Sequence, residues 1–504
     1  MEVSTAIQNG LQVKQHPQQQ QQQPQEDSLS ESLVPSSELS SASNLSSSGE
    51  DEDGSLDSTL HQIEANFSED NVPYFVKSLH EELNCALNYH SDRSMNHTEL
   101  LIPSGKECGR SLIIDLGGST LKVCIIDLLG ESKYEILARK TWEIPNDKKV
   151  ISLNFFKMMA DRVEEVLKTG QYFARGERIS TGISWSFPFE QKKPNDGYIY
   201  VVSKGYSLAD DTKGHNLAEL FSNAMRNEKG IEVEVNSIIN DAVSVYVSGL
   251  YVHACKLGLV LGTGLNASFA VGNSVINSEL SFFGSSCATS LANNAIDRGI
   301  CADYVAIPED NYLHSEYLVY QPLEYICAGR YLGEMFRLGI ELGTTHGELF
   351  ENQLSRFAQC KDLTTPYQLQ SDIVSKMSEC SYKEAKELFM KGYGLDLSKQ
   401  DFQKIVRLVE VLTNRAATVM ASALMACVKF IDEHSTVPVE DKYCRLGFVG
   451  SLLKYYTGYK EMVDAVLDRY HVQMGLPVFD LRHIDDSSIL GAAVAARAFV
   501  ASQQ

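Results

Sequence analysis

The chain has 504 residues, of which 43% are hydrophobic, and its formal net charge at pH 7 is -22. A hydrophobic core of this size normally divides, so we expect two lobes. The acidic balance argues against a nucleic-acid or anionic-membrane surface as a partner, because both require clustered lysine and arginine.

Much of the negative charge lies in the N-terminal region. Between Lys14 and Lys77 there is no lysine or arginine, but there are twelve aspartate or glutamate residues. Residues 18–23 are all glutamine, and a serine-rich stretch and the acidic block 50–53 follow. This composition cannot bury enough apolar surface to offset the entropy of ordering, so we predict a disordered tail over residues 1–65. Such a tail either carries regulation, through serine phosphorylation or regulatory partners, or only keeps the chain soluble.

The eleven cysteines are an odd number and include no Cys-x-x-Cys pair. This pattern indicates reduced thiols, and we expect a cytoplasmic protein, with a nuclear or organelle-surface fraction left open. The first residues do not resemble a signal peptide. The most apolar helical stretch, 416–431, is short and interrupted by Lys429, so no membrane span is predicted.

Globular sequence is expected from Asn66, where apolar residues at helical spacing over 72–83 predict an N-terminal helix, within 66–104, that packs on the larger lobe. Residues 112–126 then predict two strands joined by a tight hairpin. Its turn contains Gly117 and Gly118, which let the backbone approach a phosphate and adopt φ/ψ values that other residues avoid. The neighbouring Ser119 and Thr120 add hydroxyl donors, although the same residues also occur in ordinary hairpins.

A third strand is predicted at 134–142, and then a helix that Asn154 starts and Gly170 ends. A strand at 179–187 follows. Strand, strand, strand, helix, strand is the order of an RNase-H-like half. The pattern starts again at 257–271, where two apolar strands flank Gly262-Thr263-Gly264. We therefore predict two facing halves with one phosphate-binding turn on each side of a cleft.

The chain from Tyr325 onward is mainly helical, with an apolar stripe over 402–412 that predicts a long core helix. A strand at 446–449 leads into Gly450-Ser451, where free backbone N–H groups at a helix start could receive an anion. The predicted helix at 489–500 is rich in alanine after Gly491, and this glycine permits either close helix packing or close approach of a flat ring. We expect a small lobe at 105–241, a large lobe at 242–486 and a C-terminal helix, 487–504, returning to the small lobe.

Several short motifs follow one another in a fixed order. They are Trp185-Ser186-Phe187-Pro188, Ser203-Lys204-Gly205, Asn240-Asp241-Ala242-Val243, Ile276 to Glu279, Leu323-Glu324 and Gly329 to Glu334. With the two glycine turns, this series resembles the eukaryotic hexokinase family, a branch of the actin-like ATPases. The family's first phosphate loop reads Asp-Leu-Gly-Gly-Thr-Asn-Phe-Arg-Val, and residues 115–123 keep its aspartate and both glycines. The resemblance covers nearly the whole chain after the tail.

The resemblance implies an α/β fold of the two-lobed actin-like ATPase type, a duplicated RNase-H-like fold with a ligand cleft between the lobes. It also implies an ATP-dependent sugar kinase, and the residue types suit that chemistry. A sugar hydroxyl is a poor nucleophile at pH 7, so a carboxylate must accept its proton, and Asp241 is the candidate base. The alternative role for Asp241 is that of a helix N-cap.

Recognition of sugar hydroxyls needs buried acceptors and amides. The residues expected to bind the sugar are Ser186, Pro188, Ser203, Lys204, Asn240, Asp241, Asn266, Glu279 and Glu324. Lys204, with Ser203, would also hold the hydroxyl rim and the developing negative charge, so we assign it a catalytic role beside Asp241. No nucleic-acid partner is expected.

The nucleotide is expected to contact both glycine turns and the C-terminal loops. The expected residues are Asp115, Leu116, Gly117, Gly118, Ser119, Thr120, Lys122, Gly262, Thr263, Gly264, Gly450, Ser451, Ser487 and Gly491. Asp115 would hold a hydrated Mg²⁺ beside the phosphates of ATP. The γ-phosphate would lie between the two turns, with Mg²⁺ bridging the β and γ oxygens.

Departures from the family pattern concern the substrate. The Trp and Gly that follow the sugar-binding Glu in the family are Leu280 and Ser281, the Arg of the first phosphate loop is Lys122, and the last Gly-Ser-Gly loop is the segment 487–489. This pattern resembles the fungal N-acetylglucosamine kinases, because a smaller residue near the sugar would make room for a 2-acetamido group.

We therefore expect transfer of phosphate to the 6-hydroxyl of N-acetylglucosamine. Two alternatives stay open: a glucose or mannose kinase with a loosened pocket, and a sugar-sensing regulator with little or no turnover. If Leu280 is only a core residue, sugar selection would instead fall to residues such as Phe189 and Glu190.

Overall fold

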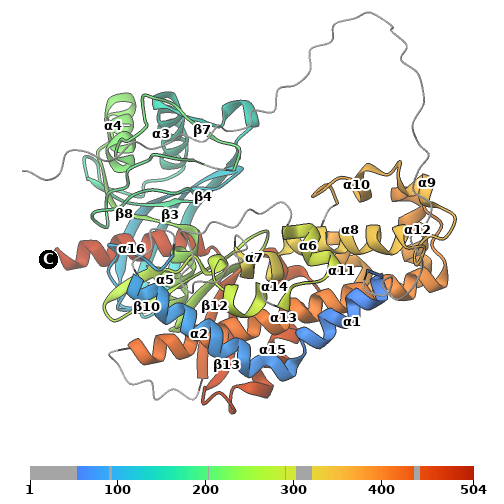
Figure 1. The fold of residues 1–504 in the computed structure, drawn as a ribbon. Helices are drawn as coiled ribbons and strands as arrows, with labels where there is room; N and C mark the ends of the chain where they lie inside the picture. Colours follow the sequence, from blue (N-terminus) through green and yellow to red (C-terminus); the bar gives the residue numbers. More distant parts are fainter. Residues whose placement is uncertain are drawn as a thin grey trace, which may run out of the picture. The chain divides into compact units, whose positions relative to one another are not determined.

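Two β-sheets with the same strand order form the centre of the computed structural model (Figure 1). It describes residues 54–89, 94–202, 204–289, 291–301, 321–369, 371–435 and 443–503, all within one structural unit, residues 50–504. The first sheet has the order β4-β3-β2-β6-β8, and the second has the order β1-β11-β10-β9-β12-β13. β2 pairs antiparallel with β3 and parallel with β6, and β9 pairs in the same ways with β10 and β12. Without β1, the sheets repeat one pattern, which confirms the predicted duplication.

The strands of the first sheet are β2 (Cys108–Leu116), β3 (Thr120–Gly130), β4 (Lys133–Glu143), β6 (Ile179–Trp185) and β8 (Val233–Ile239). The predicted hairpin is present as β2 and β3, which pair in register up to Leu116 and Leu121. Alternate residues of β2 lie in two different cores, so that both faces of the strand are buried.

Helices α3 (Leu153–Leu167) and α4 (Leu217–Lys229) cover one face of this sheet, and α16 (Ser487–Ser502) covers the other (Figure 1). The predicted caps of α3 were wrong. Ser152 caps its start, with Oγ accepting a hydrogen bond from the Phe155 N–H at 3.4 Å, and the helix ends before Gly170. Ser is as good an N-cap as Asn, so Ser152, two residues earlier, can take the role that was predicted for Asn154.

The second sheet contains β9 (Leu257–Leu261), β10 (Leu265–Val271), β11 (Ser274–Asn277), β12 (Tyr443–Val449) and β13 (Val478–His483), with β1 (Asn96–His97) at its edge. Helix α5 (Asp241–His253) packs on this sheet and against α16, which itself packs on β2, β6 and β8. A Cβ on Gly491 would lie 2.4 Å from the Ser244 carbonyl oxygen of α5. Gly491 therefore serves close helix packing, and the predicted nucleotide contact at this residue is not supported.

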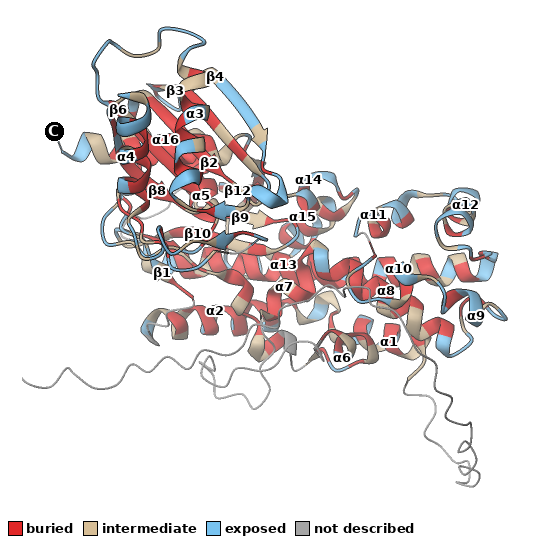
Figure 2. Cartoon of the chain, turned by 90° about the horizontal axis from the view of Figure 1, so that it is seen from above, coloured by how far each residue is buried: buried red, intermediate tan, exposed pale blue. Residues whose placement is uncertain are grey.

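Helix α13 (Lys399–His434) crosses the large lobe and joins two apolar stretches that the sequence treats separately. Its length and composition match those of a membrane-spanning helix, but 94% of its most apolar window is buried inside the protein (Figure 2). The buried Arg415 on this helix pairs with Asp297 at 2.7 Å. These features identify α13 as a core helix.

The N-terminal helices α1 (Leu56–Asn66) and α2 (Val72–Tyr89) both pack on α13. The predicted end of the tail at residue 65 was therefore wrong, because α1 already begins at Leu56. Leu56, Leu60 and Ile63 are buried, and the Leu56 N–H donates to Glu348 Oε1 at 2.6 Å. The sequence around α1 is acidic and serine-rich and has few apolar residues, so its composition did not predict a helix. Tertiary packing stabilises this helix.

The remaining elements are helices of the large lobe, four short helical turns, and two short strands that pair with each other. The helices are α6 (Ala295–Cys301), α7 (Pro322–Cys327), α8 (Gly329–Thr345), α9 (Leu354–Phe357), α10 (Lys361–Thr364), α11 (Asp372–Glu379), α12 (Tyr382–Tyr393), α14 (Ser451–Tyr455) and α15 (Tyr459–Tyr470). The single turns are η1 (Glu69–Asn71), η2 (Asn146–Lys148), η3 (Leu280–Phe282) and the π-helical η4 (Ser285–Thr289), and the short strands are β5 (Val150–Ile151) and β7 (Ser207–Leu208).

Candidate active site

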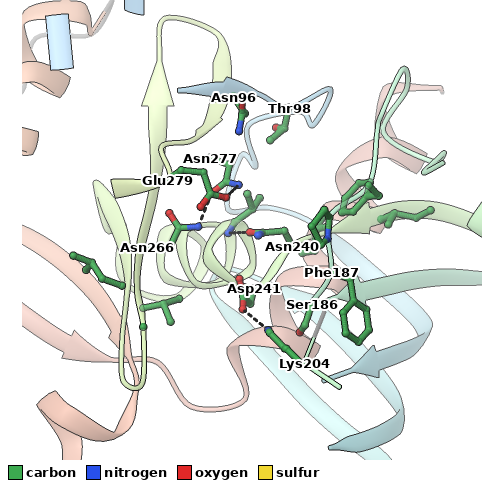
Figure 3. Close-up of a pocket in the computed structure, with 18 of the residues that line it drawn as sticks. Asn96, Thr98, Ser186, Phe187, Lys204, Asn240, Asp241, Asn266, Asn277 and Glu279 are labelled. Atoms are coloured by element: carbon green, nitrogen blue, oxygen red, sulfur yellow. Dashed lines mark hydrogen bonds and ion pairs between the residues drawn. The ribbon is translucent and has the colours of Figure 1, made fainter. Parts of the chain in front are cut away.

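A cavity of about 990 Å³ is lined by residues that follow strands of both sheets (Figure 3). The sequence-predicted residues that line it are Ser186, Pro188, Lys204, Asn240, Asp241, Gly262, Thr263, Gly264, Asn266, Glu279 and Glu324. Ser203 lies outside the described residues. The predicted sugar site and the second glycine turn are thus brought together in one cavity.

Asp241 is the first residue of α5 and directly follows β8 and Asn240. Asn240 is the N-cap of α5, and its Oδ1 accepts a hydrogen bond from the Val243 N–H at 3.1 Å. The alternative N-cap role therefore belongs to Asn240 and not to Asp241. The Oδ2 atom of Asp241 lies 3.8 Å from Lys204 Nζ, and both side chains are partly exposed to the cavity. A partly exposed carboxylate beside a cation is suitably placed to accept a hydroxyl proton.

Three cavity side chains form a hydrogen-bonded chain (Figure 3). Asn266 Nδ2 donates to Asn277 Oδ1 at 3.0 Å, and Asn277 Nδ2 donates to Glu279 Oε1 at 2.7 Å. The Ala267 N–H donates to Asn266 Oδ1 at 2.7 Å, which fixes the orientation of that amide. Asn277 thus holds two predicted sugar ligands, although the sequence analysis included it only within a motif.

Glu279 and Glu324 are mostly buried carboxylates. Burial raises the pKa of Glu279, and the nearby charge of Asp241 raises it further, while the hydrogen bond from Asn277 lowers it. Burial also raises the pKa of Glu324, against a hydrogen bond from the Leu265 N–H at 2.9 Å and the charge of Arg330. Desolvation is thus the largest cause in both cases.

Two polar residues that line the cavity, Lys204 and Glu279, have left-handed backbone conformations. The φ angle is 56° at Lys204 and 50° at Glu279. Residues other than glycine rarely adopt this conformation, and it persists only where the surrounding structure holds it. Both residues were predicted as ligands from their side chains, but nothing in the sequence signals their backbone strain.

The first glycine turn adjoins the cavity through Lys204. A Cβ on Gly118 would lie 3.2 Å from Lys204 Cδ and 3.3 Å from its Cβ. Neither Gly117 nor Gly118 has a positive φ, so the expectation of an unusual backbone conformation there was wrong. At Gly118 the missing side chain provides space for Lys204.

None of the predicted residues of this turn lines the cavity, Gly118 included. The others are Asp115, Leu116, Gly117, Ser119, Thr120 and Lys122. Asp115 Oδ2 accepts hydrogen bonds from Lys122 Nζ at 2.8 Å and from Ser488 Oγ at 2.7 Å. Ser487, which precedes Ser488 in the chain, begins α16 and also does not line the cavity. The structure thus joins the first turn and the last loop through Asp115.

The second glycine turn contacts the loop that was expected to hold the nucleotide. Gly450 has φ 116°, and a Cβ there would lie 2.1 Å from the Leu261 carbonyl oxygen. A Cβ on Gly262 would lie 3.4 Å from the Ser451 nitrogen, and the Gly329 N–H donates to the Gly262 carbonyl at 2.8 Å. Ser451 and Gly329 also line a separate cavity of about 290 Å³. A cavity thus adjoins the second turn, on the side where the nucleotide was predicted.

Several residues that line the main cavity were not predicted as ligands from the sequence. They are Asn96, His97, Thr98, Leu100, Phe187, Gln191, Asn277 and Arg330. Asn96 comes close through strand pairing, because it lies opposite Asn277 in the register of β1 and β11. A polar strand of two residues has no periodicity to detect. Arg330 lies at the start of α8, and its guanidinium lies 4.9 Å from the centre of the Tyr367 ring.

Comparisons with known proteins identify the family to which the chain belongs. Two family models, both described as hexokinase, match residues 58–251 and 256–498. The chain belongs to the hexokinase family. A curated relative, N-acetylglucosamine kinase 1 of Candida albicans, is 28% identical over 88% of this chain and 93% of its own length. Hexokinase-2 of Saccharomyces cerevisiae is 27% identical over 78% of this chain and 81% of its own length.

Solved structures show the hexokinase fold. The hexokinase from Schistosoma mansoni complexed with glucose has a TM-score of 0.66 and 22% identity, and the match covers 88% of this chain and 99% of that one. A second hexokinase crystal structure also has a TM-score of 0.66, with 18% identity and the same coverage. The protein is thus an ATP-dependent sugar kinase of the hexokinase family with the two-lobed α/β fold.

Proposed function

We propose that this hexokinase-family enzyme transfers the terminal phosphoryl group of ATP to the 6-hydroxyl of N-acetylglucosamine. The observation that carries the proposal is the composition of the cavity wall. Polar side chains such as Asn266 and Glu279 share the cavity with the apolar Leu100, Phe187 and Phe189. An acetamido group needs polar partners for its amide and an apolar contact for its methyl group. The similarity to the Candida albicans kinase supports the same substrate.

In the proposed reaction, Asp241 accepts the proton of the 6-hydroxyl as that oxygen attacks phosphorus. Asn240, Asn266 and Glu279 orient the sugar hydroxyls. Lys204, whose ammonium lies 3.8 Å from Asp241 Oδ2, stabilises negative charge that develops on the transferred group. The backbone of Gly262 to Gly264 binds phosphate oxygens from the opposite side.

We also propose Mg²⁺ as the cofactor, held mainly by the ATP phosphates and reached by Asp115 through water. The described residues contain no group of three or more His, Cys, Asp or Glu side chains that could hold a metal ion, which suits an ion ligated largely by phosphate and water. When bound, Mg²⁺ would neutralise charge on the phosphate oxygens. A chelator should abolish turnover and leave stabilisation of the protein by sugar unchanged.

The structure does not place Leu280 where a sugar in the cavity could contact it. Leu280 is 1% exposed, belongs to the large-lobe core and does not line the cavity. The Leu280 N–H lies 3.4 Å from Asn266 Oδ1, so Leu280 is behind Asn266, which lines the cavity. A Trp at this position would overpack the core. Of the two alternatives left open by the sequence, Phe189 lines the cavity and Glu190 does not.

The test compares kcat/KM for N-acetylglucosamine, glucose, mannose and glucosamine in an assay coupled to ADP release. We expect N-acetylglucosamine to give the highest value. The variant Phe189→Ala should lower kcat/KM about tenfold for N-acetylglucosamine and less than about threefold for glucose, because only the acetamido methyl loses an apolar contact. A higher kcat/KM for glucose or mannose would instead support the second candidate, a glucose or mannose kinase, which the matches to yeast hexokinases favour.

The cytoplasmic location is likewise a proposal. The cysteines described in the structure are all free thiols, as a reducing compartment requires. Cell fractionation with a tagged chain would test it, and recovery of the protein in a secreted or membrane fraction would overturn it.

A further inference from the structure

Glu82 of helix α2 is a buried carboxylate outside the cavity. Its side chain accepts hydrogen bonds from the Gly284 N–H at 2.6 Å, from the Ser286 N–H at 2.7 Å and from the Ser286 hydroxyl. The residue is 5% exposed. Burying a carboxylate is costly unless several donors satisfy it, and here all these donors come from one short segment. The backbone of residues 284–286 is thus tied to α2.

This segment directly follows the sugar ligand Glu279. The Phe282 N–H donates to the Glu279 carbonyl at 3.1 Å, so the turn η3 starts at the ligand itself. The Leu323 N–H donates to the Phe283 carbonyl at 3.0 Å, next to the second buried carboxylate, Glu324. A shift of the segment around Gly284 would therefore be transmitted to both carboxylates of the cavity.

Other hydrogen bonds from the N-terminal part of the chain hold Ser286 and residues on either side of this segment. The Tyr74 hydroxyl donates to the Ser286 carbonyl at 3.1 Å, and Asn66 Nδ2 donates to the Leu291 carbonyl at 3.0 Å. The Met95 N–H donates to the Ser278 carbonyl at 3.1 Å, one residue before Glu279. Among these contacts, those of Glu82 are the only charged ones, and charge-assisted hydrogen bonds are the stronger class.

We propose that Glu82 is a positioning residue for sugar binding, which fixes the segment 279–286 and thereby holds Glu279 in its left-handed conformation. The inference rests on the proposed role of Glu279 as a sugar ligand, but not on which sugar is bound. It makes the N-terminal helix α2 part of the substrate-recognition machinery of the enzyme. A conformation with φ 50° at Glu279 needs such external restraint, because the residue is not glycine.

The test uses the variant Glu82→Gln, which keeps the shape of the side chain and one acceptor oxygen but removes the charge. The KM for sugar should rise about fivefold or more, while the KM for ATP stays within twofold of wild type. The increase in Tm that saturating sugar produces should shrink in parallel. The sugar used is whichever hexose the wild-type enzyme phosphorylates best, so that failure of the N-acetylglucosamine assignment does not affect the result.

Two matched controls come from the same helix. Glu81→Gln removes the neighbouring carboxylate. The Glu81 side chain is 60% exposed, and its Oε1 lies 3.9 Å from Lys77 Nζ. Tyr74→Phe removes another bond between α2 and the segment but leaves Glu82 intact. Glu81→Gln should keep the KM for sugar within twofold, and Tyr74→Phe, which removes an uncharged bond to the segment, should raise it less than Glu82→Gln does. If Glu82→Gln does not fold, Ser286→Ala, which removes one donor to Glu82, should still raise the KM for sugar selectively.

A purely structural role would lower Tm and the active fraction without changing the KM for sugar of the folded enzyme. An unchanged KM for sugar in both Glu82→Gln and Ser286→Ala, or an equal rise in the KM values for sugar and ATP, would overturn the proposal.

Discussion

The Asp241 carboxylate oxygen Oδ2 lies 3.8 Å from the Lys204 ammonium, at a cavity to which both halves of the duplicated fold contribute residues. Replacing Asp241 by Asn keeps the size of the side chain but removes the proton acceptor. We expect kcat to fall about 10²- to 10⁴-fold, with the KM for sugar within about threefold of wild type. Steady-state kinetics with circular dichroism as a folding control would measure this. Retention of more than a third of the wild-type kcat would exclude Asp241 as the base.

The two turn glycines offer a matched pair of variants. A Cβ on Gly118 would press on Lys204 at 3.2 Å, whereas a Cβ on Gly117 would meet only ordinary contacts with Thr120, at 3.6 Å and beyond. Gly118→Ala should therefore displace Lys204 and lower kcat about tenfold, a loss on the scale of weakened charge stabilisation in the transition state. Gly117→Ala should stay within about twofold. Equal losses in the two variants would indicate that the hairpin tolerates no side chain for reasons unrelated to Lys204.

Glu279 links stability to pH. Its pKa in the folded state is raised above the ordinary value of 4.5, so the folded protein binds this proton more tightly than the unfolded chain does. Ionisation of Glu279 therefore reduces the stability of the folded state, and this effect develops as pH rises through the raised pKa. Glu279→Gln should have a higher Tm than wild type at pH 7, by ~1–4 °C, and no such advantage below pH 4.5.

The same variant should bind sugar poorly at every pH, because an amide replaces a carboxylate acceptor. Calorimetric melting across pH, together with sugar titrations at pH 7, would measure the two effects. A lower Tm for Glu279→Gln at pH 7 would contradict the argument from burial.

Truncation distinguishes the tail from helix α1. Removing residues 1–53 should leave kcat and Tm nearly unchanged, because that composition predicts little buried surface. Removing residues 1–66 deletes α1 with its buried Leu56, Leu60 and Ile63 and should lower Tm by several degrees, since each buried Leu or Ile contributes about 2 kcal/mol. Thermal melts of the two truncated chains would show the difference. A large loss of stability on removing only residues 1–53 would show that the tail docks on the lobes.

The sequence predicted the duplicated fold from local patterns, and much of the cavity from motifs that resemble those of the hexokinase family. Strands that lead into Gly117-Gly118 and Gly262-Thr263-Gly264 have clear periodicity, and Asp241 follows a buried strand. Some residues that were missed as ligands, such as Phe187 and Asn277, lie inside the quoted motifs, whereas others reach the site through tertiary structure. Asn96 comes close by strand register with Asn277, and Arg330 by its position at the start of α8.

Two predicted contacts receive no support from the packing. Gly491 matched a nucleotide loop in its residue type, but α5 occupies the space beside it. Leu280 follows a predicted sugar ligand in the chain, but Glu279 has a left-handed backbone, and the chain then turns through η3, which places residue 280 in the core. Neither the direction of a side chain nor the strain of a backbone is encoded in residue spacing.

The most direct measurement is a competition in which the purified enzyme receives ATP, Mg²⁺ and equal concentrations of N-acetylglucosamine and glucose, with products identified by ³¹P and ¹³C NMR. The proposed site predicts one ADP for each phosphorylated sugar, phosphate on the C6 oxygen, N-acetylglucosamine 6-phosphate as the main product, and no product from Asp241→Asn over the same period. Glucose 6-phosphate as the main product, or a phosphate on any other oxygen, would contradict it.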